Sequence, residues 1–341
     1  MAGSFIPMGK SIKILRSSIS TFLQNYQFFS TTVAFLAFPF SVSILLSQVF
    51  LPSSSSSSLL ASINNRLNAL FQAAGFPPSE FFTILTLKLS QTISSSLFSL
   101  PFTLTFLLAA KASIIQALKP HHHKVSSSPP SFSSIFSLFN PLLLTHICNS
   151  LLILSANATV FSILFFAFNF LEEIGLSSSP NWLLFLSASG AVLYSIVLAN
   201  ALIICNLAMV ISGMERTSGH LAILKAFVLI RGRTSTALSL ALPVNLLLAG
   251  TEALFQYRIL RVHHHGRNHS LAMSSEGVLI AYLYSISVVL DTIVSCIFYK
   301  SCNTSCLMEQ EGRYSYQIEI PEEETGDYVS EKNCENFHEG F

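Results

Sequence analysis

The sequence predicts an all-α membrane protein, a polytopic helical bundle. Hydrophobic residues make up 51% of the 341-residue chain and charged residues only 10%, whereas a soluble globular chain carries about 25% charged residues. The mean hydropathy is +0.58. So few charged side chains could not cover the surface of a soluble enzyme, and a disordered protein would be less apolar. A net charge of +1 without a basic patch also excludes a nucleic-acid binder.

Six stretches are long and apolar enough to cross a bilayer, which takes roughly 20 residues of helix. The apolar runs do not alternate with polar residues, so a membrane β-barrel is excluded. The third and fourth stretches exceed one crossing but are too short for two. The six predicted spans are 28–51, 82–110, 139–171, 182–212, 234–254 and 277–299.

The distribution of Lys and Arg predicts that both termini are cytoplasmic. With six spans, 13 basic residues fall on the side of the termini and four on the other side, and Lys and Arg near span ends stay cytoplasmic. Three of the four exceptions lie in the loop 255–276, which is the weakest part of the assignment. The same loop contains Asn268 in an Asn-His-Ser glycosylation pattern, which fits a lumenal position.

The two ends of the chain differ in charge. Residues 1–27 are predicted to form a basic cytoplasmic leader. The absence of any acid before Glu80 also fits a transit peptide, so a plastid or mitochondrial membrane is the alternative to the endomembrane system or plasma membrane. Residues 300–341 contain ten acids and are predicted to be a disordered cytoplasmic tail. That tail either binds a protein partner or is simply solvated.

Four ionisable residues fall inside the predicted spans, where charged groups are rare and usually paired or functional. Lys88 and Glu252 lie at similar depth near the lumenal side, which predicts an interhelical ion pair. Asp291 lies near the midplane and is predicted to face His146 or Asn149, forming a proton or cation site. Alternatively, these groups only hold helices together, at roughly 0.6 kcal/mol per contact.

The fourth span carries small residues at every fourth position. This spacing lets another helix approach closely and predicts a helix-packing face rather than a substrate path. The four residues are Ser187, Ala191, Ser195 and Ala199.

The remaining chemical motifs are weak. The two triple-histidine runs, 121–123 and 263–265, are predicted on opposite sides of the membrane and cannot share a metal, so no metal or cofactor is expected. Cys302 and Cys306 follow the last span and are possible palmitoylation sites. No Gly-rich phosphate loop or catalytic serine, zinc or paired-carboxylate pattern occurs in a soluble segment. The sequence therefore predicts a protein that is not an enzyme.

The stretch between the fourth and fifth spans is the most specific. Ser218 can cap a helix and Gly232 can end one, which predicts a helix over 219–232, too short to cross the membrane. Its apolar residues favour lipid, while His220, Lys225, Arg231 and Arg233 favour water and anionic headgroups. An interfacial amphipathic helix satisfies both preferences. The alternative is a helix that packs on the bundle outside the membrane.

This stretch resembles the signature of plant multi-pass membrane proteins of unassigned function. A looser similarity links it to the membrane region of glycerophosphodiester phosphodiesterases, whose catalytic domain is absent here. The resemblance implies a six-helix membrane protein and brings no established activity. The residues that carry it are Glu215, Gly219, Ala222, Ala226, Leu229, Gly232 and Arg233.

Two function classes follow from these observations. The first is a non-enzymatic membrane protein that organises lipids or partner proteins through the interfacial helix and the acidic tail. The second is a small-solute or ion transporter that uses Asp291, His146 and Asn149.

Overall fold

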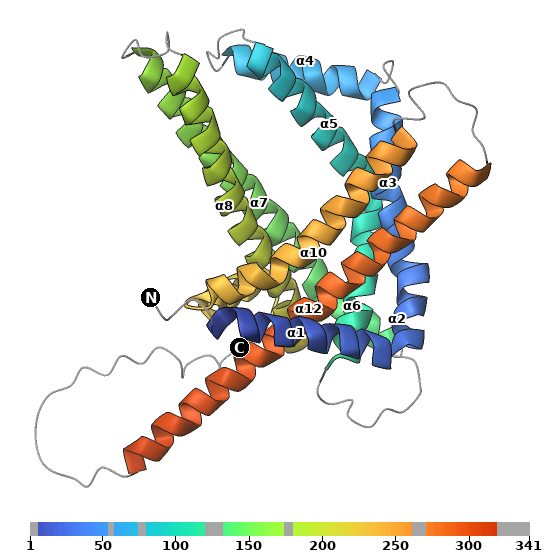
Figure 1. Cartoon of the computed structure of the whole chain (residues 1–341), viewed down its shortest axis with the longest axis vertical. Coiled ribbons are helices and arrows are strands. Elements are labelled where there is room, and N and C mark those ends of the chain that lie inside the picture. Colours follow the sequence, from blue (N-terminus) through green and yellow to red (C-terminus); the bar gives the residue numbers. More distant parts are fainter. Residues whose placement is uncertain are drawn as a thin grey trace, which may run out of the picture. The chain divides into compact units, whose positions relative to one another are not determined.

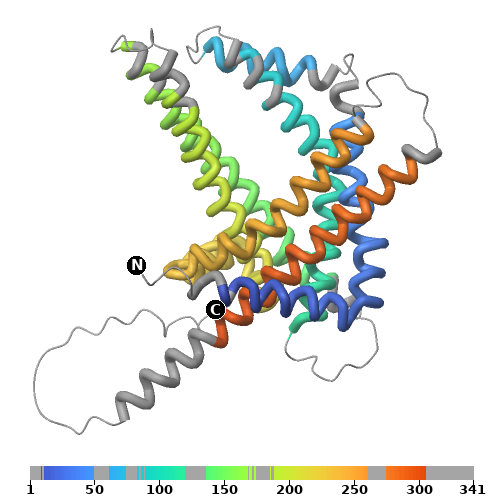
Figure 2. The backbone as a smooth tube through the Cα atoms, viewed as in Figure 1, coloured from blue at the N-terminus to red at the C-terminus, as the bar shows by residue number. Residues whose placement is uncertain are grey.

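A computed structural model describes residues 6–53, 58–73, 80–119, 132–173, 180–260 and 271–318, which are coloured in Figure 2. These residues are almost entirely helical and include no strand, which confirms the predicted all-α class. Contacts along the backbone divide the chain into two units, 1–300 and 301–341. The first unit contains the helical bundle described below.

The helices follow one another along the chain (Figure 1). Among the described residues, three short π-helical segments, labelled η, interrupt them. The elements are α1 Ile6–Gln24, α2 Tyr26–Thr32, η1 Val33–Ala37, α3 Phe38–Ser53, α4 Ser58–Ala73, α5 Glu80–Phe102, η2 Thr103–Leu107, α6 Leu108–Ala117, α7 Phe132–Glu173, α8 Pro180–Glu215, α9 His220–Ile230, α10 Thr234–Phe255, η5 Gln256–Leu260 and α12 Leu271–Ile318.

Six helices of the described residues are long and apolar enough to span a membrane, which supports the predicted multi-pass membrane protein. Each overlaps one predicted stretch, and the bounds differ by zero to seven residues. The second differs most: it starts at Leu89 and continues to Ala117, beyond the predicted end at 110, and the residues from Ala112 to Gln116 are buried. The spans are Tyr26–Val49, Leu89–Ala117, Phe136–Ala167, Ala188–Glu215, Thr234–Ile259 and Ser274–Thr304.

Two of the π-helical segments lie close to prolines. Proline lacks a backbone N–H and leaves a carbonyl of the preceding turn without its helical donor. Segment η1 comes just before Pro39, and η2 follows Pro101. Near Pro101, threonine hydroxyls donate to backbone carbonyls: Thr105 Oγ1 lies 2.7 Å from the Pro101 oxygen and Thr103 Oγ1 lies 2.9 Å from the Ser99 oxygen. Prolines inside membrane helices are tolerated where such side chains and local π-helical adjustments supply hydrogen bonds.

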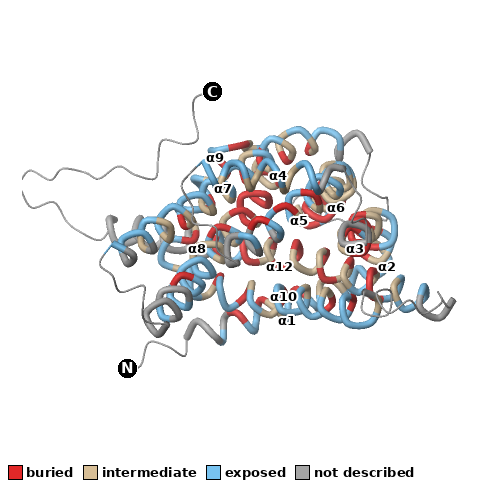
Figure 3. The backbone as a smooth tube through the Cα atoms, turned by 90° about the horizontal axis from the view of Figure 1, so that it is seen from above, coloured by how far each residue is buried: buried red, intermediate tan, exposed pale blue. Residues whose placement is uncertain are grey.

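A buried apolar cluster lies where α3, α10 and α12 meet. It contains Leu45, Val49, Phe255 and Ile280. The Ser285 hydroxyl donates to Ser41 Oγ over 2.9 Å and ties α12 to α3. Elsewhere α7 and α8 run side by side. Figure 3 shows buried residues on the inner faces and long exposed stretches on the outer faces, as expected of helices whose outer sides contact lipid.

The predicted leader contains a helix. Within 1–27, α1 packs on α10, with Ser11 Oγ 2.6 Å from Ser239 Oγ. Ser11, Ile14 and Ser18 recur on its buried face, whereas Ile12 and Leu23 are exposed. Composition alone gave no sign of this contact, because the packing face is built from serines as much as from apolar residues.

The predicted tail also begins as helix. Disorder was expected from residue 300, but α12 continues to Ile318. No proline occurs between residues 300 and 320, and Leu307, Met308 and Glu309 favour helix. Residues 319–341, with most of the acidic charge, lie outside the described part of the chain.

Candidate functional site

The carboxylate of Glu215, at the C-terminal end of α8, joins three helices. It accepts hydrogen bonds from the Lys225 ammonium on α9 and from the Tyr299 hydroxyl on α12. The Lys225 side chain is 52% exposed and that of Glu215 only 24%. Lys225 therefore has an intramolecular partner, and the acid of the family-like signature acts as an anchor for α9.

The turn between α8 and α9 is fixed by an unusual backbone and a buried hydroxyl cluster. Gly219 has φ +66° and ψ −133°, a conformation that side chains other than hydrogen strongly disfavour. Its N–H donates to Thr145 Oγ1 on α7 over 3.0 Å. Thr145 Oγ1 also lies 2.9 Å from Ser212 Oγ on α8. The glycine of the signature therefore allows the turn to dock on α7.

Helix α9 has one small buried face and one large exposed face. Ala222 and Ala226 are fully buried, and α9 contacts both α7 and α8. The outward face carries large apolar side chains that are 43–67% exposed. This confirms a short helix over nearly the predicted range, and its position at a membrane interface stays a prediction. The exposed apolar residues are Leu221, Leu224, Phe227 and Val228.

The end of α9 is basic and turns sharply into α10. Gly232 has φ +83°, which favours glycine and allows the turn. Arg231 is exposed, Arg233 and Leu229 are partly buried. Burial, and then the nearby guanidinium of Arg216, lower the pKa of Lys119, which follows α6. The turns at this end of the bundle therefore gather several cations.

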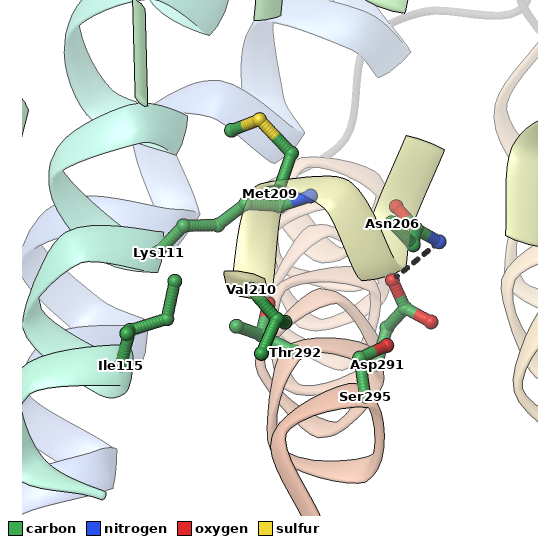
Figure 4. Close-up of a pocket in the computed structure, with 8 residues that line it drawn as sticks. All are labelled: Lys111, Ile115, Asn206, Met209, Val210, Asp291, Thr292 and Ser295. Carbon is green, nitrogen blue, oxygen red and sulfur yellow. Dashed lines mark hydrogen bonds between the residues drawn. The ribbon is translucent and has the colours of Figure 1, made fainter. Parts of the chain in front are cut away.

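A second polar site lies inside the span region, between α6, α8 and α12 (Figure 4). Asn206 Nδ2 donates to Asp291 Oδ2 over 3.2 Å. Lys111 reaches from α6 toward α8 and lines the same pocket as Asp291 of α12. The pocket leaves no room for a water molecule between the side chains. Its lining residues are Lys111, Ile115, Asn206, Met209, Val210, Asp291, Thr292 and Ser295.

The hydrogen bonds of Asp291 and Asn149 go to different partners from those predicted. Asn149 Nδ2 donates to the Cys205 carbonyl over 3.0 Å and joins α7 to α8. Asp291 uses Asn206, and His146 is partly buried on α7. Among the described side chains, no hydrogen bond links Asp291 to His146 or Asn149. Asn149 lies on the side of α7 that contacts α8.

At the opposite end of the bundle, Glu252 accepts a hydrogen bond from Gln48 of α3. Gln256 Nε2 lies 3.4 Å from Gln48 Oε1. The side chain of Lys88 is outside the described side chains, so its predicted ion pair with Glu252 stays a prediction. Arg258 and Glu276, both well exposed, form a pair at 4.0 Å near this end.

The described part of the chain leaves most of the small-residue face of α8 uncovered. Ala191 and Ser195 are exposed and Ala199 is partly buried, while Ser187 is outside the described side chains. The contact with α7 uses another side of α8, where Gly190 lies against Leu164. A four-residue spacing identifies a smooth face but does not tell whether a helix or lipid covers it.

The modification sites have mixed outcomes. Cys302 is 2% exposed, so its thiol is not accessible to acylation in this conformation. The side chain of Cys306 and the whole of Asn268 lie outside the described residues. Among those that are described, no three His, Cys, Asp or Glu side chains gather as metal ligands.

Several site residues were missed by sequence reasoning. Lys111 was placed in a loop, although the apolar run after it signals that the helix continues. Tyr299 ends the predicted last span, and nothing in the sequence pairs it with Glu215. Gln48 and Thr145 are ordinary polar residues in apolar runs, and only the packing of the helices reveals their partners.

Comparisons with known proteins identify a family and no activity. A family model described as a domain of unknown function, DUF8558, matches residues 8–333. No curated protein and no solved structure matches the chain. The chain therefore belongs to the DUF8558 family.

Proposed function

We propose that this member of the DUF8558 family is a non-enzymatic integral membrane protein that organises lipids through the outward faces of α1 and α9. The observation that carries the proposal is the outward face of α9. Four of its 11 residues are large, apolar and exposed, while Glu215 holds the helix against the bundle. In a bilayer such a face lies at the boundary between headgroups and acyl chains.

Helix α1 supports the same proposal, because it also exposes apolar and basic residues. Ile12, Ile19 and Leu23 are exposed on it, and Lys13 and Arg16 are exposed beside them. The segment contains no acid. Because α1 packs on α10 close to the Ser239 position, just after the basic turn of α9, the cations of both helices can meet one leaflet. Basic residues beside apolar ones favour anionic lipids.

The test compares anionic with zwitterionic lipid. The full chain is reconstituted in nanodiscs of phosphatidylcholine with or without phosphatidylserine, and the thermal unfolding midpoint is measured. The anionic lipid is expected to raise the midpoint. Arg16→Glu combined with Arg231→Glu is expected to abolish that rise. Arg66→Glu on α4, also exposed, is the matched control and should retain it. An equal rise in all three proteins would contradict the proposal.

The same proposal includes three further parts. Both termini lie in the cytoplasm, and the protein resides in the endomembrane system or the plasma membrane. The acidic tail binds a protein partner. The chain is related to plant multi-pass membrane proteins and, more loosely, to the membrane region of glycerophosphodiester phosphodiesterases. A fluorescent fusion at the C-terminus, with glycosylation measured at Asn268, tests topology and location together. A lumenal C-terminus or an organellar signal would contradict the assignment.

The transporter alternative rests on a different observation, the charged pocket between α6, α8 and α12. It does not depend on the outward faces of α1 and α9.

A further inference from the structure

Two opposite charges share one small pocket within the span region. Lys111 comes from α6 and Asp291 from α12, and Asn206 of α8 binds the carboxylate. Each charge at membrane depth costs roughly 2.5–3.5 kcal/mol on insertion scales. The described ion pairs within 4.0 Å involve other residues. The Lys111 ammonium and the Asp291 carboxylate therefore share a pocket without forming a direct ion pair. Such residues inside spans are functional candidates by default.

The size of the pocket decides which ligand it can take. In this conformation no water molecule fits between its side chains, so neither a solute nor a hydrated cation would fit. The described residues also gather no third carboxylate, imidazole or thiolate that would complete a metal site. A proton needs no volume, because it becomes a hydroxyl hydrogen of the Asp291 carboxyl group.

The surrounding charges suit a group that gains and loses a proton. Lys111 of α6 and Asp291 of α12 line the same pocket. Burial of the Asp291 carboxylate favours its neutral form, whereas the Lys111 ammonium favours its ionised form. Because the two effects oppose each other, a proton taken up by Asp291 can also be released.

Polar groups on α12 lead from Asp291 toward both ends of the bundle. In one direction lie Ser295 and then Tyr299, which binds Glu215. In the other lie Ser285, whose hydroxyl donates to Ser41, and Tyr284, which packs against the apolar cluster of α3, α10 and α12 near Glu252. At 1.5 Å per residue, Asp291 and Tyr299 are about 12 Å apart along the helix. The site thus lies between two carboxylates at opposite ends of the bundle.

We propose that Asp291 and Lys111 form a proton-exchange site through which the bundle carries protons across its membrane. A carboxylate oxygen of Asp291 forms an O–H bond with a proton delivered from one side and gives the same proton to water on the other. No other bond changes, and no oxidant or reductant takes part. Exchange requires the pocket to open to water, so the described conformation is the closed one.

The experiment uses the purified full chain in liposomes that contain a pH-sensitive dye. A potassium gradient with valinomycin sets the membrane potential and drives protons inward. Liposomes with the protein are expected to acidify faster than protein-free liposomes. If both acidify at the same rate, the proposal is overturned without any variant.

Variants then separate a proton site from helix packing. Asp291→Asn keeps the size and the hydrogen bond to Asn206 but cannot ionise, so flux should fall to the protein-free rate. Glu276→Gln removes an exposed acid of the same helix and should keep the flux. If Asp291→Asn fails to fold, as judged by its elution and thermal unfolding, Lys111→Met takes its place and should slow the flux. Full flux in the folded variant would refute the site. Arg16→Glu with Arg231→Glu should not alter flux, so the two proposals fail separately.

Discussion

The two halves of α8 have similar hydropathy and opposite surroundings. In the first half, Val192 and Ile196 are 60% and 54% exposed. In the second half, from Leu207 to Gly213, every residue is buried. The first half therefore packs on α7 and leaves a wide apolar face exposed, whereas the second half contacts α6, α7, α9 and α12. Hydropathy identifies a helix that leaves water, but it does not distinguish a helix neighbour from an acyl chain.

The polar residues follow the same division. Ser195 in the first half donates to its own helix, to the Ala191 carbonyl. Cys205, Asn206, Ser212 and Glu215 in the second half take part in contacts with other helices. Ser195, on the exposed side, thus forms its hydrogen bond within its own helix, whereas the polar residues of the buried half form hydrogen bonds to other helices. The Glu215 contacts and the Asp291 pocket both involve this buried half.

The largest difference is expected at the two glycines of α8. A Cβ at Gly213 would meet Ile115 Cδ1 and Cγ2 at 2.8 Å, close to the stem of a fully buried side chain. Gly213→Val should therefore lower the free energy of unfolding by about 3 kcal/mol, the upper range for overpacking. At Gly190 the obstacle is the flexible end of Leu164, so Gly190→Val should be milder. Equal losses in a denaturant titration in mixed micelles would contradict the contrast.

A smaller loss is expected at Gly219. There the neighbouring Cys148 and Leu144 atoms lie at ordinary contact distances of 3.5 Å, so the strain comes from the backbone. Gly219→Ala should cost about 2 kcal/mol and loosen α9, which hydrogen exchange over residues 220–230 would detect. Unchanged exchange would show that the turn can relax. Gly232 also has a positive φ, +83°, and a Cβ there would meet open space. Gly232→Ala therefore measures the backbone strain at a turn without neighbouring side chains.

The effect at Asn149 should be smaller still. Asn149→Ala removes one interhelical hydrogen bond to the Cys205 carbonyl, and such bonds average about 0.6 kcal/mol. The same micelle titration measures the loss. A loss several times larger would mean that the buried half of α8 forms a cooperative polar network rather than separate contacts.

The smallest effect is expected on the exposed face of the first half. Ser195→Leu should change stability by no more than about 0.5 kcal/mol, as at ordinary surface positions. Sedimentation of the detergent-solubilised protein should give the same mass as for the unchanged chain. A change of mass would show that a second copy covers this face and that the small-residue spacing identifies an intermolecular contact.

Much of the fold could be predicted from the sequence because the bilayer imposes a simple length rule. Six apolar stretches correspond to six long apolar helices, and the segment with Gly219 and Gly232 does form a short helix. The partners within the bundle could not be predicted. The predicted second span ended before Lys111, which placed this residue in a loop. The partner of Asp291 was predicted on α7, whereas Asn206 of α8 binds it. The depth of a residue in a span does not specify which face of its helix meets which neighbour.

The account depends most on the outward face of α9 lying in the membrane interface. The chain has one tryptophan, Trp182, so Trp182→Phe with Phe227→Trp places a single fluorophore on that face. In liposomes, lipids brominated near the headgroup end of the acyl chain should quench its fluorescence, and aqueous iodide should not. Quenching by iodide and not by brominated lipid would show that α9 lies in water, and the proposed lipid surface would not exist.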